Sequence, residues 1–129
     1  MKISELALAS NVAAKTIRYY EQVGLLAPAR RNDSGYRQYQ AEDINALVFI
    51  RRCRELNIAI EDIKKLLDVQ QNPKASCAFV DEMIEKQLNR IQQTQQELAM
   101  LESTLSALAS SCANNKIEDC SILHQLKSN

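Results

Sequence analysis

The first third of the chain alternates between short amphipathic segments and polar breaks. Apolar residues recur at helical spacing within residues 4–10 and again within 13–23, and Ser10 and Asn11 interrupt the pattern between them. This spacing predicts two short helices joined by a tight turn, which is a helix-turn-helix. Gly24 predicts the end of the second helix, because glycine readily adopts the left-handed conformation that follows many helices.

Residues 25–40 combine turn-forming residues with strand-like alternation. Pro28, Asp33 and Gly35 favour turns, and the run YRQY at 36–39 alternates with a period of two. The segment therefore predicts a small β-hairpin, or wing. Helical spacing resumes over 41–56 and 60–71 and ends before Pro73.

A long helix is predicted over 78–110, where there is neither Gly nor Pro. Its apolar residues recur at three- and four-residue steps, at Val80, Ile84, Leu88, Ile91, Leu98, Leu101, Leu105 and Leu108. This is a coiled-coil stripe, although Gln95 lies on the seam and the repeat is imperfect. One helix cannot bury such a stripe, and the chain offers no second long helix. A homodimer is therefore predicted.

The predicted fold is mainly α and has three parts. They are a winged helix-turn-helix DNA-binding domain at 1–72, a dimerisation helix at 73–110, and a loop with a short terminal helix at 111–129. The 129-residue chain has only two Gly and two Pro, which favours helix. It has no apolar run long enough to span a membrane, and its first ten residues lack a signal-peptide core, so we expect a cytoplasmic protein. In that compartment the four cysteines should be reduced.

Charge is divided unevenly along a chain whose net charge is zero. Residues 1–56 carry nine Lys or Arg against six acids, and residues 57–129 carry seven against ten. A basic front half suggests that this half contacts a polyanion. A recognition helix in the major groove and cations on phosphates would use the residues Lys15, Thr16, Arg18, Tyr20, Arg30, Arg31, Tyr36 and Arg37, while Ile17 faces the core.

Three cysteines flank the predicted long helix. Cys77 precedes it, and Cys112 and Cys120 follow it in a polar stretch, with seven residues between them. Thirty-five residues of helix span roughly 50 Å, so Cys77 and Cys112 of one chain cannot share an ion. In an antiparallel dimer the start of one helix lies beside the end of its mate. Two equivalent sites would then form, each from Cys77 of one subunit and the loop of the other.

Three thiolates indicate a soft or borderline divalent ion, namely Cd, Pb, Hg or Zn. A monovalent ion such as Cu(I) would need only the two loop thiolates. His124, the only histidine, follows Cys120 by four residues and is a candidate fourth ligand. Cys53 lies on an apolar helical stripe and is predicted to be a small core residue.

The run KTIRYYEQVGLL, the wing SGYRQY, the long helix and the paired cysteines together resemble the MerR family of bacterial transcription regulators. The resemblance covers nearly the whole chain. The set Cys77, Cys112 and Cys120 looks most like the branch that responds to cadmium and lead. Two departures are Ala13, where the family often has a Ser or Thr cap, and the missing histidine-rich tail of some cadmium-responsive relatives.

The resemblance implies a mechanism. A dimer would bind an inverted repeat in the promoter of a metal-resistance or efflux gene. Without metal it would repress transcription, and with metal it would distort the same DNA so that RNA polymerase can start. The effector would be a divalent soft metal, with Cd or Pb ahead of Zn or Hg.

Two other functions fit parts of the sequence. A thiol redox sensor would form a reversible disulfide between Cys112 and Cys120. A coiled-coil interaction module would have no role on DNA. An enzyme is not expected, because the sequence shows no clustered acid–base pair and no phosphate-binding loop.

Overall fold

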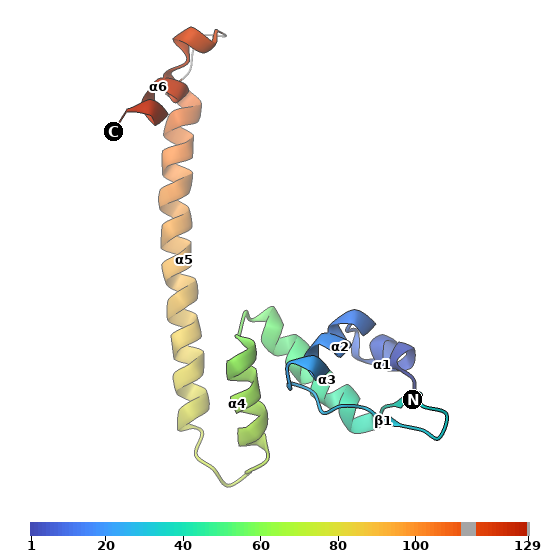
Figure 1. Cartoon of the computed structure of the whole chain (residues 1–129). Helices are drawn as coiled ribbons and strands as arrows, with labels where there is room; N and C mark the ends of the chain where they lie inside the picture. Colours follow the sequence, from blue (N-terminus) through green and yellow to red (C-terminus); the bar gives the residue numbers. More distant parts are fainter. Residues whose placement is uncertain (112–115, 129) are drawn as a thin grey trace. The chain divides into compact units, whose positions relative to one another are not determined.

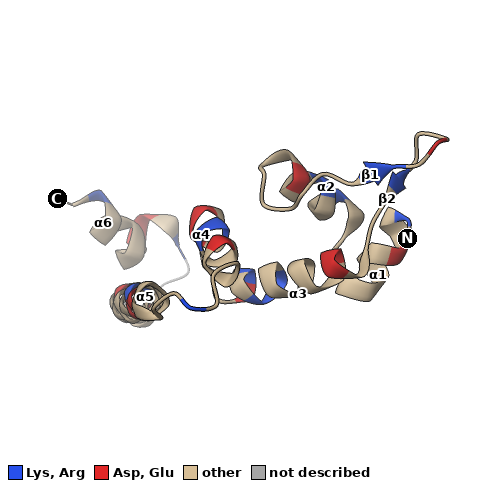
Figure 2. Cartoon of the chain, turned by 90° about the horizontal axis from the view of Figure 1, so that it is seen from below, with Lys and Arg blue, Asp and Glu red and all other residues tan. Residues whose placement is uncertain are grey.

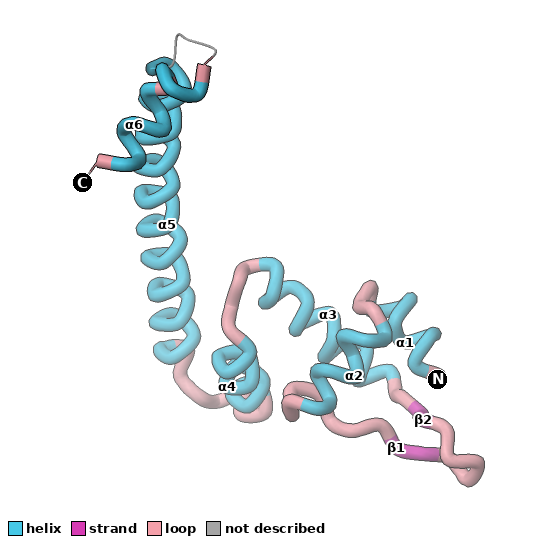
Figure 3. The backbone as a smooth tube through the Cα atoms, turned by 45° about the horizontal axis from the view of Figure 1, so that its top comes forward, coloured by secondary structure: helices cyan, strands magenta, loops and turns pink. Residues whose placement is uncertain are grey.

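The computed structural model describes residues 1–111 and 116–128. Its elements, in chain order, are α1 (Ile3–Ser10), α2 (Ala14–Gln22), β1 (Arg30–Arg31), β2 (Arg37–Gln38), α3 (Ala41–Glu55), α4 (Ile60–Gln70), α5 (Ala78–Ser111), the 3-10 turn η1 (Ile117–Asp119) and α6 (Ser121–Lys127) (Figure 1). Helices dominate, and the strands are short (Figure 3). The prediction of a mainly helical winged helix-turn-helix is confirmed. The chain divides into two compact units, Met1–Met83 and Ile84–Asn129.

Local backbone chemistry sets the ends of the first two helices. The Lys2 N–H donates to a carboxylate oxygen of Glu5 at 3.2 Å, which satisfies a donor at the start of α1. Asn11 then ends α1 in the left-handed conformation, with φ of 58°. Ala13 caps α2 without a side-chain hydrogen bond, as its methyl group dictates. Gly24 has φ of 79°, so the predicted glycine stop is confirmed.

The wing is a two-stranded antiparallel hairpin that pairs Arg30 with Gln38 and Arg31 with Arg37. Its turn is organised by Asn32, whose side-chain oxygen accepts hydrogen bonds from the N–H groups of Ser34 and Tyr36, both at 3.0 Å. Gly35 has φ of 81°, a conformation that suits glycine.

Helix α3 packs against α1 of the helix-turn-helix, and α4 packs against α3. The Gln40 N–H donates to a carboxylate oxygen of Asp43 at 2.8 Å where α3 begins. The helix gives way to Asn57 in the left-handed conformation, with φ of 60°. Arg54 then donates to the carbonyl oxygen of Ile58 at 2.8 Å. These contacts hold the turn from which α4 starts.

One core unites the first unit. Its buried apolar residues are Leu6, Val12, Ile17, Tyr20, Leu25, Leu26, Tyr39, Leu47, Ile50, Cys53, Ile58, Ile63, Leu66 and Met83. Met83 comes from the first turns of α5, so the start of the long helix completes this core. Cys53 is 7% exposed, and its prediction as a core residue is confirmed.

In the second unit the long helix leaves its stripe uncovered. Leu98, Leu101 and Leu105 are 59%, 60% and 64% exposed in the single chain. Exposed apolar area of this extent indicates a surface for another partner. In the part of the chain that the structure describes, no helix has the length and apolar character needed to cross a membrane.

Candidate functional site: a basic reading face and a thiol loop

The second helix of the helix-turn-helix presents an alternation of buried and exposed side chains. Ile17 is fully buried, as predicted, while Lys15 and Arg18 are exposed. Tyr20 is only 8% exposed and belongs to the core. Tyr19, which sequence reasoning did not select, is 48% exposed. The tyrosine that α2 offers to solvent is therefore Tyr19, because residues 17 and 20 lie one helical turn apart on the buried face.

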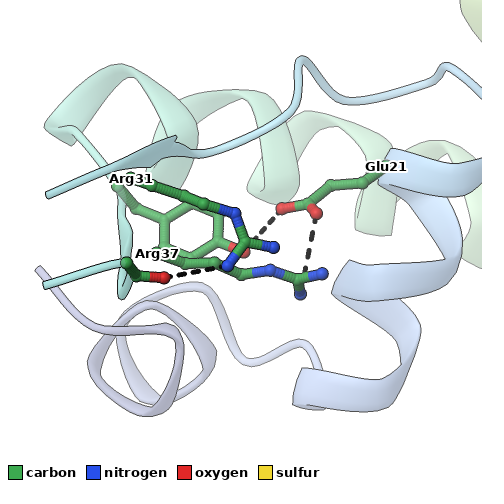
Figure 4. A network of polar contacts seen from close by, with 5 residues as sticks. Glu21, Arg31 and Arg37 are labelled. Carbon is green, nitrogen blue, oxygen red and sulfur yellow. Dashed lines mark hydrogen bonds and ion pairs between the residues drawn. The ribbon is translucent and has the colours of Figure 1, made fainter.

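The wing adds a second cationic element. Figure 2 shows Lys and Arg concentrated on both strands. Arg30, Arg31 and Tyr36 are exposed, and the Arg31 guanidinium donates to the Gly35 carbonyl oxygen at 2.8 Å. Arg37 lies 3.7 Å from a carboxylate oxygen of Glu21 on α2, and Figure 4 shows the two side chains facing each other. Arg31 and Arg37 are thus oriented by contacts within the unit.

A basic hollow lies where α1, α2 and the wing meet. Its volume is about 340 Å³, and its lining residues are Lys2, Ile3, Ser4, Arg18, Arg31, Gly35, Tyr36 and Arg37. Four of these carry positive charge and none carries negative charge. Such a surface suits a phosphate group, which accepts charge-assisted hydrogen bonds from Arg and Lys. Sequence reasoning missed Lys2, because its role depends on where α1 begins.

A second hollow of about 340 Å³ lies between the start of α2 and the end of α3. Its lining residues are Asn11, Val12, Ala13, Thr16, Tyr20, Arg51, Arg54 and Glu55. Two predicted site residues, Thr16 and Tyr20, are among them. Arg51 is held in place there by Glu55, at 2.9 Å, and by the Ser10 carbonyl oxygen, at 3.2 Å.

Tyr39 directly follows β2 and connects the wing to α2. Its hydroxyl donates to Glu21 at 2.5 Å. Burial and the neighbouring carboxylate raise the pKa of Tyr39 to about 12, from the ordinary 10.0, and its phenol is a hydrogen-bond donor at neutral pH. A donor is what the Glu21 carboxylate requires.

The thiols lie at the two ends of the long helix. Cys77 is exposed and immediately precedes α5, and its carbonyl oxygen accepts the Asp81 N–H at 3.0 Å. Cys112 lies outside the described residues. Cys120 is partly exposed and caps α6. The helix between the upstream thiol and the loop has 34 residues.

The base of the loop is closed by two serines. The Ser121 hydroxyl lies 2.7 Å from the Ser111 carbonyl oxygen and 3.0 Å from the Ser111 hydroxyl. These residues directly precede Cys112 and directly follow Cys120. The hydrogen bond therefore brings together the two residues that flank the segment 112–120.

His124 lies one turn into α6, and its ring is engaged within the terminal segment. Its Nε2 atom lies 2.8 Å from the Glu118 carbonyl oxygen. Because a carbonyl oxygen only accepts, Nε2 carries the proton and Nδ1 is left as the atom that could bind a metal. Among residues 1–111 and 116–128, no three His, Cys, Asp or Glu side chains gather closely enough to hold an ion. The predicted site draws Cys77 from a second subunit and includes Cys112.

Two family models match the chain. The model of the MerR HTH family regulatory protein matches residues 1–70, and the model described as MerR, DNA binding matches residues 44–108. Together they extend from the helix-turn-helix into the long helix.

Relatives match along nearly the whole length. An HTH-type transcriptional regulator of Pseudomonas aeruginosa is 38% identical over 99% of this chain and 97% of its own. The heavy metal-dependent transcription regulator 2 of Rhizobium meliloti is 33% identical over 98% of this chain and 86% of its own. The crystal structure of the transcription regulator PbrR691 from Ralstonia metallidurans CH34, in complex with lead(II), has a TM-score of 0.88 and 31% identity, covering 98% of both chains.

Proposed function

The chain belongs to the MerR family of helix-turn-helix regulatory proteins, and we propose that it is a homodimeric regulator of transcription whose effector is a divalent soft metal. Helix α2 would enter the major groove of promoter DNA, and the wing would contact the flanking phosphates. The dimer would bind an inverted repeat, repress without metal, and activate by distorting the DNA for RNA polymerase when metal binds.

The basic hollow supports the DNA part of this proposal. Arg18 from α2 and Arg37 from the wing line one surface, so the groove-reading helix and the phosphate-binding wing face the same side. Arg31 and Tyr36 also line it, and Lys15 on α2 and Arg30 on the wing are exposed. Neutralising phosphates with such cations is the main source of affinity for DNA.

The observation that carries the metal part is the hydrogen bond between Ser121 and Ser111. It closes a loop whose two ends bear Cys112 and Cys120. Cys77 of the partner subunit would supply the third thiolate, provided that the long helices run antiparallel. Three thiolates favour Cd(II) or Pb(II), with Zn(II) and Hg(II) as further options, and His124 would join only through Nδ1. The similarity to a lead(II)-bound regulator supports the same effector class.

Mixed dimers test the shared site. A Cys77→Ser chain and a Cys112→Ser chain should each bind Cd(II) weakly as homodimers. Their heterodimer would contain one complete site, made from the intact Cys77 of one chain and the intact loop of the other. Thiolate-to-metal absorption should therefore return at one ion per heterodimer.

A Cys53→Ala chain is the matched control, because Cys53 is buried in the first unit and should leave metal binding unchanged. Tight binding by the Cys77→Ser homodimer, or no recovery in the heterodimer, would contradict the shared site. DNA binding measured on the same samples tests the first part of the proposal separately.

A thiol redox sensor is the second candidate, because the closed loop base would equally suit a disulfide between Cys112 and Cys120. This function predicts a transcriptional response to peroxide that survives Cys77→Ser. The metal-sensing function predicts that the response to Cd(II) is lost in that variant.

A further inference from the structure

The carboxylate of Glu21, in the last turn of α2, is largely withdrawn from solvent. Its side chain is 10% exposed. Removing a carboxylate from water is costly unless other groups solvate it. The two groups that the structure places beside it are the Tyr39 hydroxyl and the Arg37 guanidinium. Both come from the β2 side of the wing, and neither comes from the helix itself.

Tyr39 is a fixed point for that end of the wing. It is 2% exposed, and its hydroxyl reaches Glu21 at 2.5 Å. Its N–H donates to the Met1 carbonyl oxygen at 2.9 Å, and its own carbonyl oxygen accepts from the Met1 nitrogen at 2.9 Å. The residue at the root of β2 is thus joined to the start of the first helix by its backbone and to α2 by its side chain.

The wing cannot set its own direction. Each strand has two residues, and a two-stranded hairpin of this size is marginal alone. On the β1 side, the segment that leads into the wing is held by Leu25 and Leu26, which are buried. Their N–H groups donate to the Tyr20 carbonyl oxygen at 2.9 and 3.1 Å. The angle between the wing and α2 therefore depends on the contacts of Leu25 and Leu26 before β1 and of Tyr39 after β2.

Arg37 connects the β2 end of the wing to the basic hollow. Its guanidinium lies 3.7 Å from Glu21, and the same residue lines the basic hollow. A guanidinium has five N–H donors, so it can serve a carboxylate and a phosphate together. A phosphate bound in the hollow and the Glu21 carboxylate would thus both contact the Arg37 side chain.

We propose that Glu21, Tyr39 and Arg37 form a latch that fixes the angle between the wing and the reading helix, which makes Glu21 a positioning residue for DNA distortion. This inference rests on the proposed DNA-binding function. The latch holds the phosphate contacts of the wing at a set displacement from the base contacts of α2. Loosening it changes the shape imposed on the bound DNA more than it changes the affinity for that DNA.

The experiment compares Tyr39→Phe, which removes only the hydroxyl, with the wild-type dimer. Glu21→Gln is the conservative partner variant, because it keeps an acceptor for Tyr39 but loses the charge that pairs with Arg37. Ile63→Val, in the core of the same unit but outside the latch, is the control for a general loss of stability.

The first measurement needs no DNA. Hydrogen exchange should become about tenfold faster at the Tyr39 amide and at the β2 ladder amides in Tyr39→Phe, beyond any change seen in Ile63→Val, because one root hydrogen bond has been lost. Glu21→Gln should give a smaller increase. Equal exchange in Tyr39→Phe and the control would overturn the latch even if the protein binds no DNA.

The second measurement uses a duplex that carries the sequence footprinted by the wild-type dimer, labelled at both ends to report bending, with and without Cd(II). Tyr39→Phe should keep affinity within about threefold of wild type but give a different end-to-end distance. A parallel loss of affinity with unchanged bending would assign Tyr39 a merely structural role and overturn the inference. Absence of binding by the wild-type protein would instead refute the proposed function, and the exchange measurement would still decide the latch.

Discussion

Ser121 donates its hydroxyl proton to the carbonyl oxygen of Ser111 across ten residues of sequence, at 2.7 Å. One partner is the last residue of α5 and the other is the first residue of α6. A short polar segment between two helices would otherwise have a wide choice of separations between its ends. This contact reduces that choice before any ion binds, and preorganisation of this kind favours binding.

Replacing Ser121 should therefore weaken the loop as a metal site. Ser121→Ala is expected to lower the affinity for Cd(II) about fivefold, which corresponds to one hydrogen bond worth about 1 kcal/mol. Competition titration with a chelator, followed by thiolate-to-metal absorption, measures the change. Ser128→Ala is the matched control, because Ser128 also donates to a carbonyl oxygen, that of Gln125, but outside the loop. Equal affinities of the two variants for Cd(II) would contradict a role of the Ser121–Ser111 hydrogen bond in metal binding.

The His124 ring should keep its proton on Nε2. The contact with the Glu118 carbonyl oxygen, at 2.8 Å, requires a donor at that atom. Nitrogen NMR of the imidazole should show the Nε2–H tautomer at pH 8, before metal is added. After ¹¹³Cd(II) is added, any coupling to this ring should appear at Nδ1. Coupling at Nε2 would show that the terminal helix rearranges on binding.

Tyr39 should produce a late alkaline transition. Its pKa is about 12 in the folded protein, against 10.0 for the ordinary phenol, so the folded state disfavours its ionised form. The stabilisation is complete below pH 10 and is lost as pH rises towards 12, because the unfolded chain releases this proton first. Absorbance titration of phenolate should show a late component that Tyr39→Phe removes. Its persistence in that variant would assign it to another group.

The exposed stripe of α5 should be the dimer surface. Leu101→Lys places a charge in the apolar groove that Leu98, Leu101 and Leu105 line. We expect the dimer dissociation constant to rise about a hundredfold, since burying one leucine contributes about 1.5–3 kcal/mol. Sedimentation equilibrium measures this constant. Met100→Lys is the control, because Met100 is 72% exposed and does not line the groove. Similar effects from both variants would argue against this face.

Residues close in sequence were the predictable ones. The glycine stop at Gly24 and the buried position of Cys53 follow from local conformation and helical period, and both are confirmed. The family match also confirms a regulator rather than an enzyme. The exposure of Tyr19 in place of Tyr20 was missed, although the spacing from Ile17 already indicated it. Tyrosine is found both in cores and on surfaces, so residue type alone does not distinguish Tyr19 from Tyr20.

Contacts across the chain were beyond sequence reasoning. Glu21 and Tyr39 are eighteen residues apart, and their hydrogen bond depends on how the wing returns to the core. Nothing in the local sequence around Glu21 indicates that its carboxylate is shielded from solvent. The Ser111–Ser121 contact is similar, because its existence depends on where two helices end. The assignment of Cys77, Cys112 and Cys120 to one shared ion remains a prediction.

Because Cys53 is buried, its rate of chemical modification reports how often the first unit opens. This thiol is 7% exposed, and burial raises its pKa, so little of it is present as the reactive thiolate. An alkylating dye reaches it only when the surrounding helices part. Mass spectrometry of its peptide over time would therefore report how often the DNA-binding unit opens, independently of anything that happens at the other cysteines.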